Sequence, residues 1–192
     1  MTEPVFTVAN QLTMLRMALV PAFVLLTLGR EFSWALVVFV VAGLTDALDG
    51  YIARHGNQST KLGSMLDPVA DKLLTGSAYV VLTWSSVVAC AMPVWLTVTL
   101  LFRDAMLVVG VVVVNLTIGP REFRSSLLGK ASTALTLATG GAVLAANATG
   151  DCPSALRWLY AATLGVLIAS TGHYVYQASE HPRKRVAPGS EA

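Results

Sequence analysis

The chain has 192 residues, of which 55% are hydrophobic and 12% are charged, and its formal net charge is +2. Soluble domains carry about 25% charged residues, so this composition excludes an ordinary water-soluble domain. The apolar runs are about 20 residues long, which is the length a helix needs to cross a hydrocarbon layer of roughly 30 Å. We therefore expect an all-α integral membrane protein with a single domain over residues 1–192.

Six apolar segments are predicted to cross the membrane. They are Thr13–Leu28, Ser33–Tyr51, Gly63–Trp84, Pro93–Asn115, Lys130–Ala148 and Ser154–Tyr176. Residues 1–12 are expected to lie at the membrane interface, and residues 179–192 to form a basic tail that attracts anionic lipids. Because the N-terminus lacks the basic region and cleavage site of a secretory signal, we expect the first span to be retained.

The Lys and Arg residues of the connections predict the orientation, since cytosolic connections carry an excess of them. With both termini in the cytosol, the outer connections hold only Arg30 and Arg157. The inner side then holds Arg54, Lys61, Arg121, Arg124, Lys130, Arg183, Lys184 and Arg185. This orientation puts the connection between the second and third spans at the cytosolic face.

Four carboxylates gather where the second span ends and the third begins. Asp46 and Asp49 are three residues apart and Asp67 and Asp71 are four apart, so each pair shares one helical face. A carboxylate inside a membrane segment costs roughly 2.5–3.5 kcal/mol on insertion scales and usually has a function. If residues 54–63 form a short turn between antiparallel helices, the two pairs converge. Hard divalent cations, Mg²⁺ or Mn²⁺, would then relieve their repulsion.

The residues between the carboxylates leave room for a phosphate. Gly50 and Ala53 are small and leave space beside the second-span carboxylates, and Arg54 offers a planar fork of donors. Together these residues indicate a metal-bound pyrophosphate. Two other interpretations do not require this spacing. The carboxylates could line a cation path in a transporter, or form structural ion pairs with Arg54, Lys61, Lys72 or Arg103.

The pattern Asp46-x-x-Asp49-Gly50-x-x-Ala53-Arg54, eight residues, Gly63-x-x-x-Asp67-x-x-x-Asp71 resembles the signature of the CDP-alcohol phosphatidyltransferases, with no position missing. The resemblance implies that Asp46, Asp49 and Asp67 bind metal, and that Asp71 binds metal and is the general base. It also implies two Mg²⁺ or Mn²⁺ ions, with Gly50, Ala53, Arg54 and Gly63 near the CDP phosphates.

The first span opens with Asn10-Gln-Leu-Thr13-Met-Leu-Arg16, which resembles the Asn…Thr…Arg opening of the phosphatidylglycerophosphate synthase and cardiolipin synthase branches. That resemblance implies that Asn10 and Thr13 lie near the nucleotide and Arg16 near the acceptor or a phosphate. The alternative is a helix cap by Asn10 or Thr13, with Arg16 extending to the membrane interface.

Two basic residues further along the chain, Arg103 and Lys130, are also candidates. Arg103 and its acidic neighbour Asp104 lie inside the fourth span, where a charged residue is a functional-site hypothesis. Because adjacent helical residues face different directions, we expect Arg103 to turn inward and bind phosphate, and not to be satisfied by Asp104 alone. A salt bridge to another span is the alternative. Gly129-Lys130-x-x-Thr133 resembles the segment that opens the fifth span in the family, so Lys130 is a second acceptor or phosphate ligand.

The acceptor is inferred from the fourth span. Phosphatidylglycerophosphate synthases tend to carry a second basic residue after the arginine of this span, whereas no Lys or Arg follows Arg103 before Arg121. Phe102-Arg103-Asp104-Ala-Met-Leu resembles the corresponding run of the eukaryotic-type, CDP-diacylglycerol-dependent cardiolipin synthases. We therefore expect phosphatidyl transfer from CDP-diacylglycerol to phosphatidylglycerol, giving cardiolipin and CMP. Glycerol 3-phosphate is the alternative acceptor, and inositol phosphate and serine also stay open.

The resemblance further implies a homodimer among membrane lipids, in a bacterial plasma membrane or a mitochondrial inner membrane, with the site facing the cytosol or matrix. No nucleic-acid partner is expected. Cys90 and Cys152 fall on the opposite side of the membrane in the predicted topology. They could form a disulfide in an oxidising compartment. We favour the interpretation that they are two isolated small apolar residues.

Overall fold

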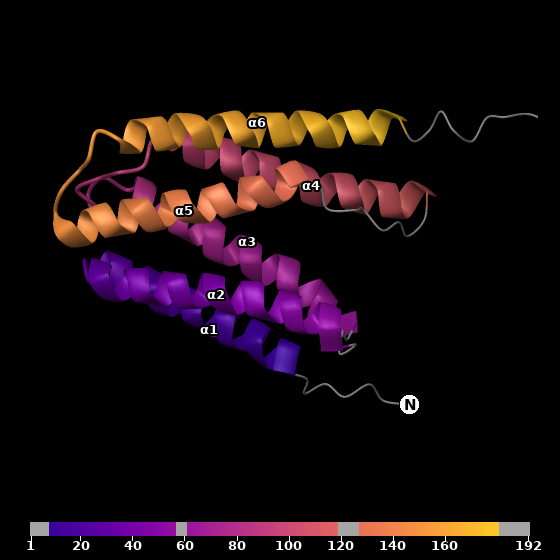
Figure 1. Cartoon of the computed structure of the whole chain (residues 1–192), viewed down its shortest axis with the longest axis horizontal. Coiled ribbons are helices and arrows are strands. Elements are labelled where there is room, and N and C mark those ends of the chain that lie inside the picture. The colour runs from indigo at the N-terminus through magenta and orange to yellow at the C-terminus, as the bar shows by residue number, and fades with distance from the viewer. Residues whose placement is uncertain (1–7, 57–60, 119–126, 181–192) are drawn as a thin grey trace, which may run out of the picture.

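The computed structural model describes residues 8–56, 61–118 and 127–180, and these fold into six α-helices without a strand (Figure 1). The helices are α1 (Val8–Leu28), α2 (Phe32–Gly56), α3 (Lys61–Thr83), α4 (Val94–Ile118), α5 (Leu127–Thr149) and α6 (Leu156–Glu180). The prediction of an all-α fold is confirmed, and each predicted span falls on one helix.

Most helices extend beyond the predicted spans. α1 begins at Val8, so the stretch from Val8 to residue 12 is helical, although it was predicted to be part of an interfacial segment. Asn10 and Thr13 therefore lie inside α1, and the alternative interpretation in which either of them caps the helix is wrong. α2 continues to Gly56 and α3 begins at Lys61, so residues 54–56 and 61–63 of the predicted turn are helical, and residues 57–60 lie outside the described residues. Hydropathy marks where a helix is apolar, whereas its backbone hydrogen bonds continue into polar sequence.

The six helices lie side by side with alternating direction (Figure 1). We call the end where α2 finishes and α3 begins the aspartate end, and the end with the α1–α2, α3–α4 and α5–α6 connections the disulfide end. α1 packs against α2 and α3, α5 packs against α2 and α6, and α4 packs against α3 and α6. Both ends of the described chain lie at the aspartate end (Figure 1).

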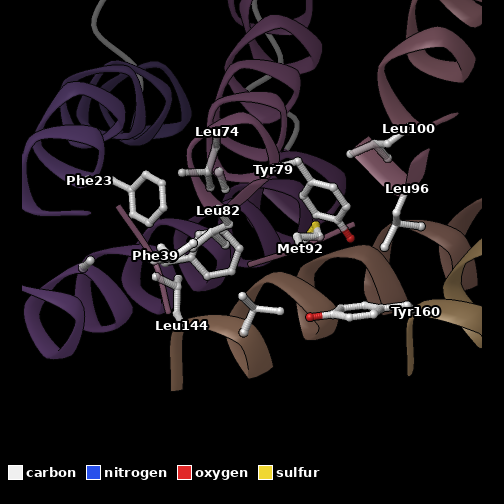
Figure 2. Packing of buried hydrophobic residues seen from close by; sticks show 14 of the residues in the cluster. Phe23, Phe39, Leu74, Tyr79, Leu82, Met92, Leu96, Leu100, Leu144 and Tyr160 are labelled. Carbon is white, nitrogen blue, oxygen red and sulfur yellow. The ribbon is translucent and has the colours of Figure 1, made fainter. Parts of the chain in front are cut away.

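Aromatic and small residues pack α1, α2 and α5 closely together. The ring centroids of Phe23 on α1 and Phe39 on α2 are 5.6 Å apart. Gly140 of α5 faces the Phe39 ring so closely that a Cβ built on it would lie 3.1 Å from Phe39 Cζ. Small residues permit such close helix packing in lipid. The core continues through side chains of α3, α4, α5 and α6 (Figure 2): Leu74, Tyr79, Leu82, Leu96, Leu100, Leu144 and Tyr160.

Two segments in the described ranges are long and apolar enough to cross a membrane, Gln11–Leu28 and Leu127–Thr149. A shorter apolar segment covers Phe32–Thr45. Large apolar side chains are exposed on several helices, among them Leu25, Phe102 and Trp158. Extensive exposed apolar surface is what contact with lipid produces. The fold is that of a membrane-associated helical protein.

Cys90 and Cys152 form a disulfide whose Cα atoms are 5.5 Å apart, so our interpretation of two isolated cysteines is wrong. The bond joins the α3–α4 and α5–α6 connections. Asn147 reinforces the junction, because Cys90 N–H donates to Asn147 Oδ1 (2.9 Å) and Asn147 Nδ2 donates to the Cys90 carbonyl (3.1 Å). The cysteines are separated by 62 residues and only the fold brings their connections together. Arg30 Nη2 also donates to the Ser86 carbonyl, which ties the α1–α2 turn to the same end.

Candidate active site

The residues of the aspartate-rich pattern lie on the two helices that meet at the aspartate end. Asp46, Asp49, Gly50, Ala53 and Arg54 occupy the last turns of α2, and Gly63, Asp67 and Asp71 occupy the first turns of α3. α2 and α3 run in opposite directions and contact each other. The helical backbone therefore places both halves of the pattern at one end of the bundle. Asp71 is the only one of these residues whose side chain is among the described ones, and the side chain of Asn10 on α1 also lies outside them.

Asp71 is partly buried, with 22% of its side chain exposed. Its Oδ2 atom lies 3.9 Å from Lys72 Nζ, so the two neighbours form an ion pair. Thr75 Oγ1 donates to the main-chain carbonyl of Asp71 one turn earlier in α3. The sequence left ion pairs between the aspartates and Lys72 open, and the longer of the two Lys72 contacts is the one with Asp71.

A metal site is not visible among the described side chains, since no three His, Cys, Asp or Glu residues gather in that part of the structure. The donor chemistry of the pattern can still be judged. Its fixed positions offer four carboxylates and no sulfur or imidazole. Oxygen-only donors suit Mg²⁺ and Mn²⁺ and disfavour softer ions. The residue types thus fit the predicted ions, while the assignment of the ligands stays a prediction.

One carboxylate oxygen of Asp104 on α4 contacts two cationic side chains, those of Lys72 and Arg103. Its Oδ1 lies 3.0 Å from Lys72 Nζ of α3 and 2.9 Å from Arg103 Nη1. We expected that Asp104 alone would not satisfy Arg103. The guanidinium does turn back to its neighbour, because it lies at the end of a long side chain, but it also binds Ser170 through Nη2, so Asp104 is not its only partner. The predicted alternative of an inter-span salt bridge exists here, but it is made by Lys72 and not by Arg103.

Arg103 is buried, with 5% of the residue exposed, so its predicted inward orientation is confirmed. Its Nη2 donates to Ser170 Oγ of α6 at 3.2 Å. Its Nε is buried and makes no hydrogen bond within the described residues. A buried cation with an unused donor is suited to an anionic ligand. Phosphate binding by Arg103 stays a prediction.

Thr13 and Arg16 of α1 lie on one helical face and are both buried, Arg16 completely. The alternative in which Arg16 extends to the membrane interface is therefore wrong. α1 packs against α2 and α3, the two helices that carry the aspartate pattern. A guanidinium buried in an apolar helix is a functional-site hypothesis by default.

Lys130 lies apart from this group in the described structure. It is the fourth residue of α5, not its first, and its side chain is exposed. No ion pair between described residues joins it to Asp71 or Asp104. The sequence interpretation missed Ser170 as a partner of Arg103, since a serine in a small-residue helix indicates close packing as readily as a hydrogen bond. The charged cluster of the described site thus consists of Asp71, Lys72, Asp104 and Arg103, anchored on Ser170.

A family model described as CDP-alcohol phosphatidyltransferase matches residues 6–169. The chain belongs to this family. The matched range contains every predicted site residue, from Asn10 to Lys130, together with Lys72 and Asp104. Ser170 lies one position beyond it.

Three relatives place the chain more closely within the CDP-alcohol phosphatidyltransferases. It is 43% identical over 138 residues to a cardiolipin synthase (CMP-forming) of Streptomyces coelicolor, an alignment covering 69% of this chain and 62% of the relative. It is 46% identical over 110 residues to the cardiolipin synthase (CMP-forming) of Homo sapiens, covering 57% and 35%. A CDP-diacylglycerol--glycerol-3-phosphate 3-phosphatidyltransferase of Salmonella paratyphi A is 43% identical over 82 residues, covering 41% and 44%. The chain therefore spans less than two thirds of each relative.

Proposed function

We propose that this chain transfers a phosphatidyl group from CDP-diacylglycerol to phosphatidylglycerol, giving cardiolipin and CMP. The observation that carries the proposal is the charged cluster at Asp71. The last carboxylate of a complete family signature lies beside Lys72, and Asp104 links Lys72 to the buried Arg103. The cluster thus joins the carboxylate that we propose as proton acceptor to the buried cation that we propose as phosphate ligand, two functions that a phosphoryl transfer requires.

In the proposed reaction the acceptor hydroxyl oxygen forms a bond to the lipid-bearing phosphorus of CDP-diacylglycerol. The bond between that phosphorus and the bridging oxygen breaks, and CMP leaves with that oxygen. Asp71 takes the proton of the attacking hydroxyl. Arg16 on α1, Arg103 on α4 and Lys130 on α5 bind phosphate oxygens of the substrates. Asn10, Thr13, Gly50, Ala53, Arg54 and Gly63 line the nucleotide side.

Asp46, Asp49, Asp67 and Asp71 would hold two Mg²⁺ or Mn²⁺ ions. When bound, such ions neutralise the charge that develops on the phosphates and on the leaving group. Carboxylates that converge without a cation would repel one another and bind protons more readily. The all-oxygen donor set supports this assignment.

The acceptor assignment rests on α4 beyond Arg103. The chain has no Lys or Arg from there to Arg121, and Val108 and Val109 are exposed on the helix surface. An acceptor without a free phosphate monoester, embedded in the same lipid layer, does not need a second basic ligand on that helix. Glycerol 3-phosphate is the second candidate, which the similarity to the Salmonella transferase favours.

We also propose that all six helices span the membrane of a bacterium or the inner membrane of a mitochondrion. The disulfide supports the orientation, because such bonds persist in oxidising compartments. The disulfide end would then face outward, and the aspartate end the cytosol or matrix. The excess of Lys and Arg in the predicted inner connections favours the same orientation. The family resemblance further suggests a homodimer.

The test uses the purified chain in detergent with CDP-diacylglycerol, Mg²⁺ or Mn²⁺, and one acceptor at a time. We expect CMP release and a cardiolipin product with phosphatidylglycerol, detected by nucleotide chromatography and lipid mass spectrometry. Turnover with glycerol 3-phosphate but not with phosphatidylglycerol would reverse the ranking of acceptors. Absence of CMP release with every acceptor would refute the proposed activity.

A further inference from the structure

Two carboxylates compete for the ammonium group of Lys72. Its Nζ lies 3.0 Å from Asp104 Oδ1 on α4 and 3.9 Å from Asp71 Oδ2 on its own helix. Electrostatic attraction falls with distance, so Asp104 attracts the ammonium more strongly than Asp71 does. The Asp104 side chain is only 12% exposed, and water therefore screens this pair weakly.

Asp104 is itself held in place by a second contact. Arg103 Nη1 donates to the same Oδ1 atom at 2.9 Å, and Arg103 Nη2 donates to Ser170 Oγ at 3.2 Å. Contacts therefore run from Ser170 on α6 through Arg103 and Asp104 on α4 to Lys72 on α3. This arrangement fixes the carboxylate that receives the ammonium.

We propose that Asp104 is a positioning residue, which holds the Lys72 ammonium on α4 and so keeps it from neutralising Asp71. The inference rests on the proposed function, in which Asp71 binds a divalent cation and accepts a proton. An ammonium bound directly to Asp71 would oppose metal binding, because it competes with the cation for the same carboxylate. Asp104 thus acts on the reaction through Lys72 and does not touch the substrate.

The test measures Mn²⁺ binding to the purified full chain by electron paramagnetic resonance of the free ion, without substrate. Asp104→Asn keeps the size of the side chain and removes its charge. We expect its Kd for Mn²⁺ to rise about fivefold or more, because Lys72 then turns to Asp71. Adding Lys72→Met to Asp104→Asn should return the Kd to within about twofold of the wild type. Asp104→Glu keeps the charge and should bind Mn²⁺ nearly as the wild type does.

Two further variants make the result decisive. Arg157→Met removes an exposed cation at the disulfide end, and we expect its Kd for Mn²⁺ to equal that of the wild type. Lys72→Met alone should bind Mn²⁺ at least as tightly as the wild type. Weaker binding by Lys72→Met would overturn the proposal even if Asp104→Asn failed to fold. Wild-type affinity in Asp104→Asn, or no recovery in the double variant, would also overturn it.

Activity measurements separate this inference from the proposed function. If the wild type releases no CMP but the variants shift Mn²⁺ binding as expected, the proposed reaction fails and the role of Asp104 stands. If the wild type releases CMP and the Kd for Mn²⁺ is the same in all variants, the role of Asp104 fails and the reaction stands.

Discussion

At the scale of single residues, Asp71 combines partial exposure with an adjacent cation. Its carboxylate is reachable from outside the core, whereas Arg103, at the far end of the cluster, is buried. A group that takes a proton from a substrate has to be reachable, and a group that only supplies charge can act from a buried position. This difference fits the separate roles proposed for the two residues.

Asp71→Asn tests the proton-accepting role. The amide cannot take a proton from the acceptor hydroxyl and is a poorer cation ligand, so CMP release should fall by about 100-fold or more. The thermal unfolding midpoint should stay close to that of the wild type, because the isosteric amide fits the same space. Asp151→Asn, the same change at an exposed residue of the disulfide end, serves as the matched control and should keep its turnover. Near-normal turnover in Asp71→Asn would remove Asp71 from the role of base.

The sequence predicts the chemistry of these residues better than their contacts. The spacing of the four aspartates and the charge inside α4 identify the helices on which the candidate residues lie, because a charged residue in an apolar segment needs a reason to be there. It does not predict that Arg103 binds its neighbour Asp104, since that depends on how a long side chain folds back. Nor does it predict the bond to Ser170, which is 67 residues away and has no motif around it.

At the scale of the helices, α5 shows why small residues matter in this bundle. The helix carries Gly140 against the ring of Phe39, and that ring also faces Phe23 of α1. The ring of Phe39 thus contacts both α1 and the glycine of α5. Where lipid surrounds a bundle, close packing of this kind replaces much of the hydrophobic drive that holds soluble helices together.

Gly140→Leu should weaken this junction, because the new side chain would overlap the Phe39 ring. Overpacking of a core typically costs about 1–3 kcal/mol, and we expect a lower midpoint of thermal unfolding in detergent. Gly165→Leu is the matched control, since Gly165 lies on α6 with no atom of the structure within 4 Å of a Cβ built there. A midpoint for Gly140→Leu equal to that of Gly165→Leu would show that Phe39 moves aside at no cost.

The number of helices follows from the lengths of the apolar runs, whereas their ends do not. α2 continues through Arg54 to Gly56, and α4 continues beyond Asn115 to Ile118. Polar residues leave the apolar window without ending the helix, because the main chain can remain hydrogen-bonded in water. Hydropathy therefore predicted the order of the elements, and the predicted boundaries differ from the helix ends by up to five residues.

At the scale of the whole molecule, the two ends of the bundle are built differently. The charged residues and the other candidate site residues lie at the aspartate end and along the adjoining parts of α3 and α4. The disulfide end is fastened by Cys90–Cys152, by Asn147 and by the Arg30–Ser86 hydrogen bond. The candidate reaction thus takes place away from the covalent junction, and the two can be tested independently.

Replacing both cysteines by serine should lower stability and spare catalysis. A disulfide that closes a loop of this length typically contributes about 2–4 kcal/mol, so the unfolding midpoint should fall. A reductant should lower the midpoint of the wild type and leave that of the double variant unchanged, as followed by intrinsic fluorescence. CMP release by the folded double variant should stay close to the wild-type rate. A wild-type midpoint that is insensitive to complete reduction, verified by thiol labelling, would contradict the expected stabilisation.

The cross-link also determines which pieces of the polypeptide can separate. Cys90 follows the three helices that carry Arg16 and the aspartates, and Cys152 precedes the helix that carries Ser170. A single cleavage anywhere between these two cysteines therefore leaves one covalent molecule, which migrates as a single species until it is reduced. Two separately translated fragments, divided between α4 and α5, would by the same bond become one covalent molecule.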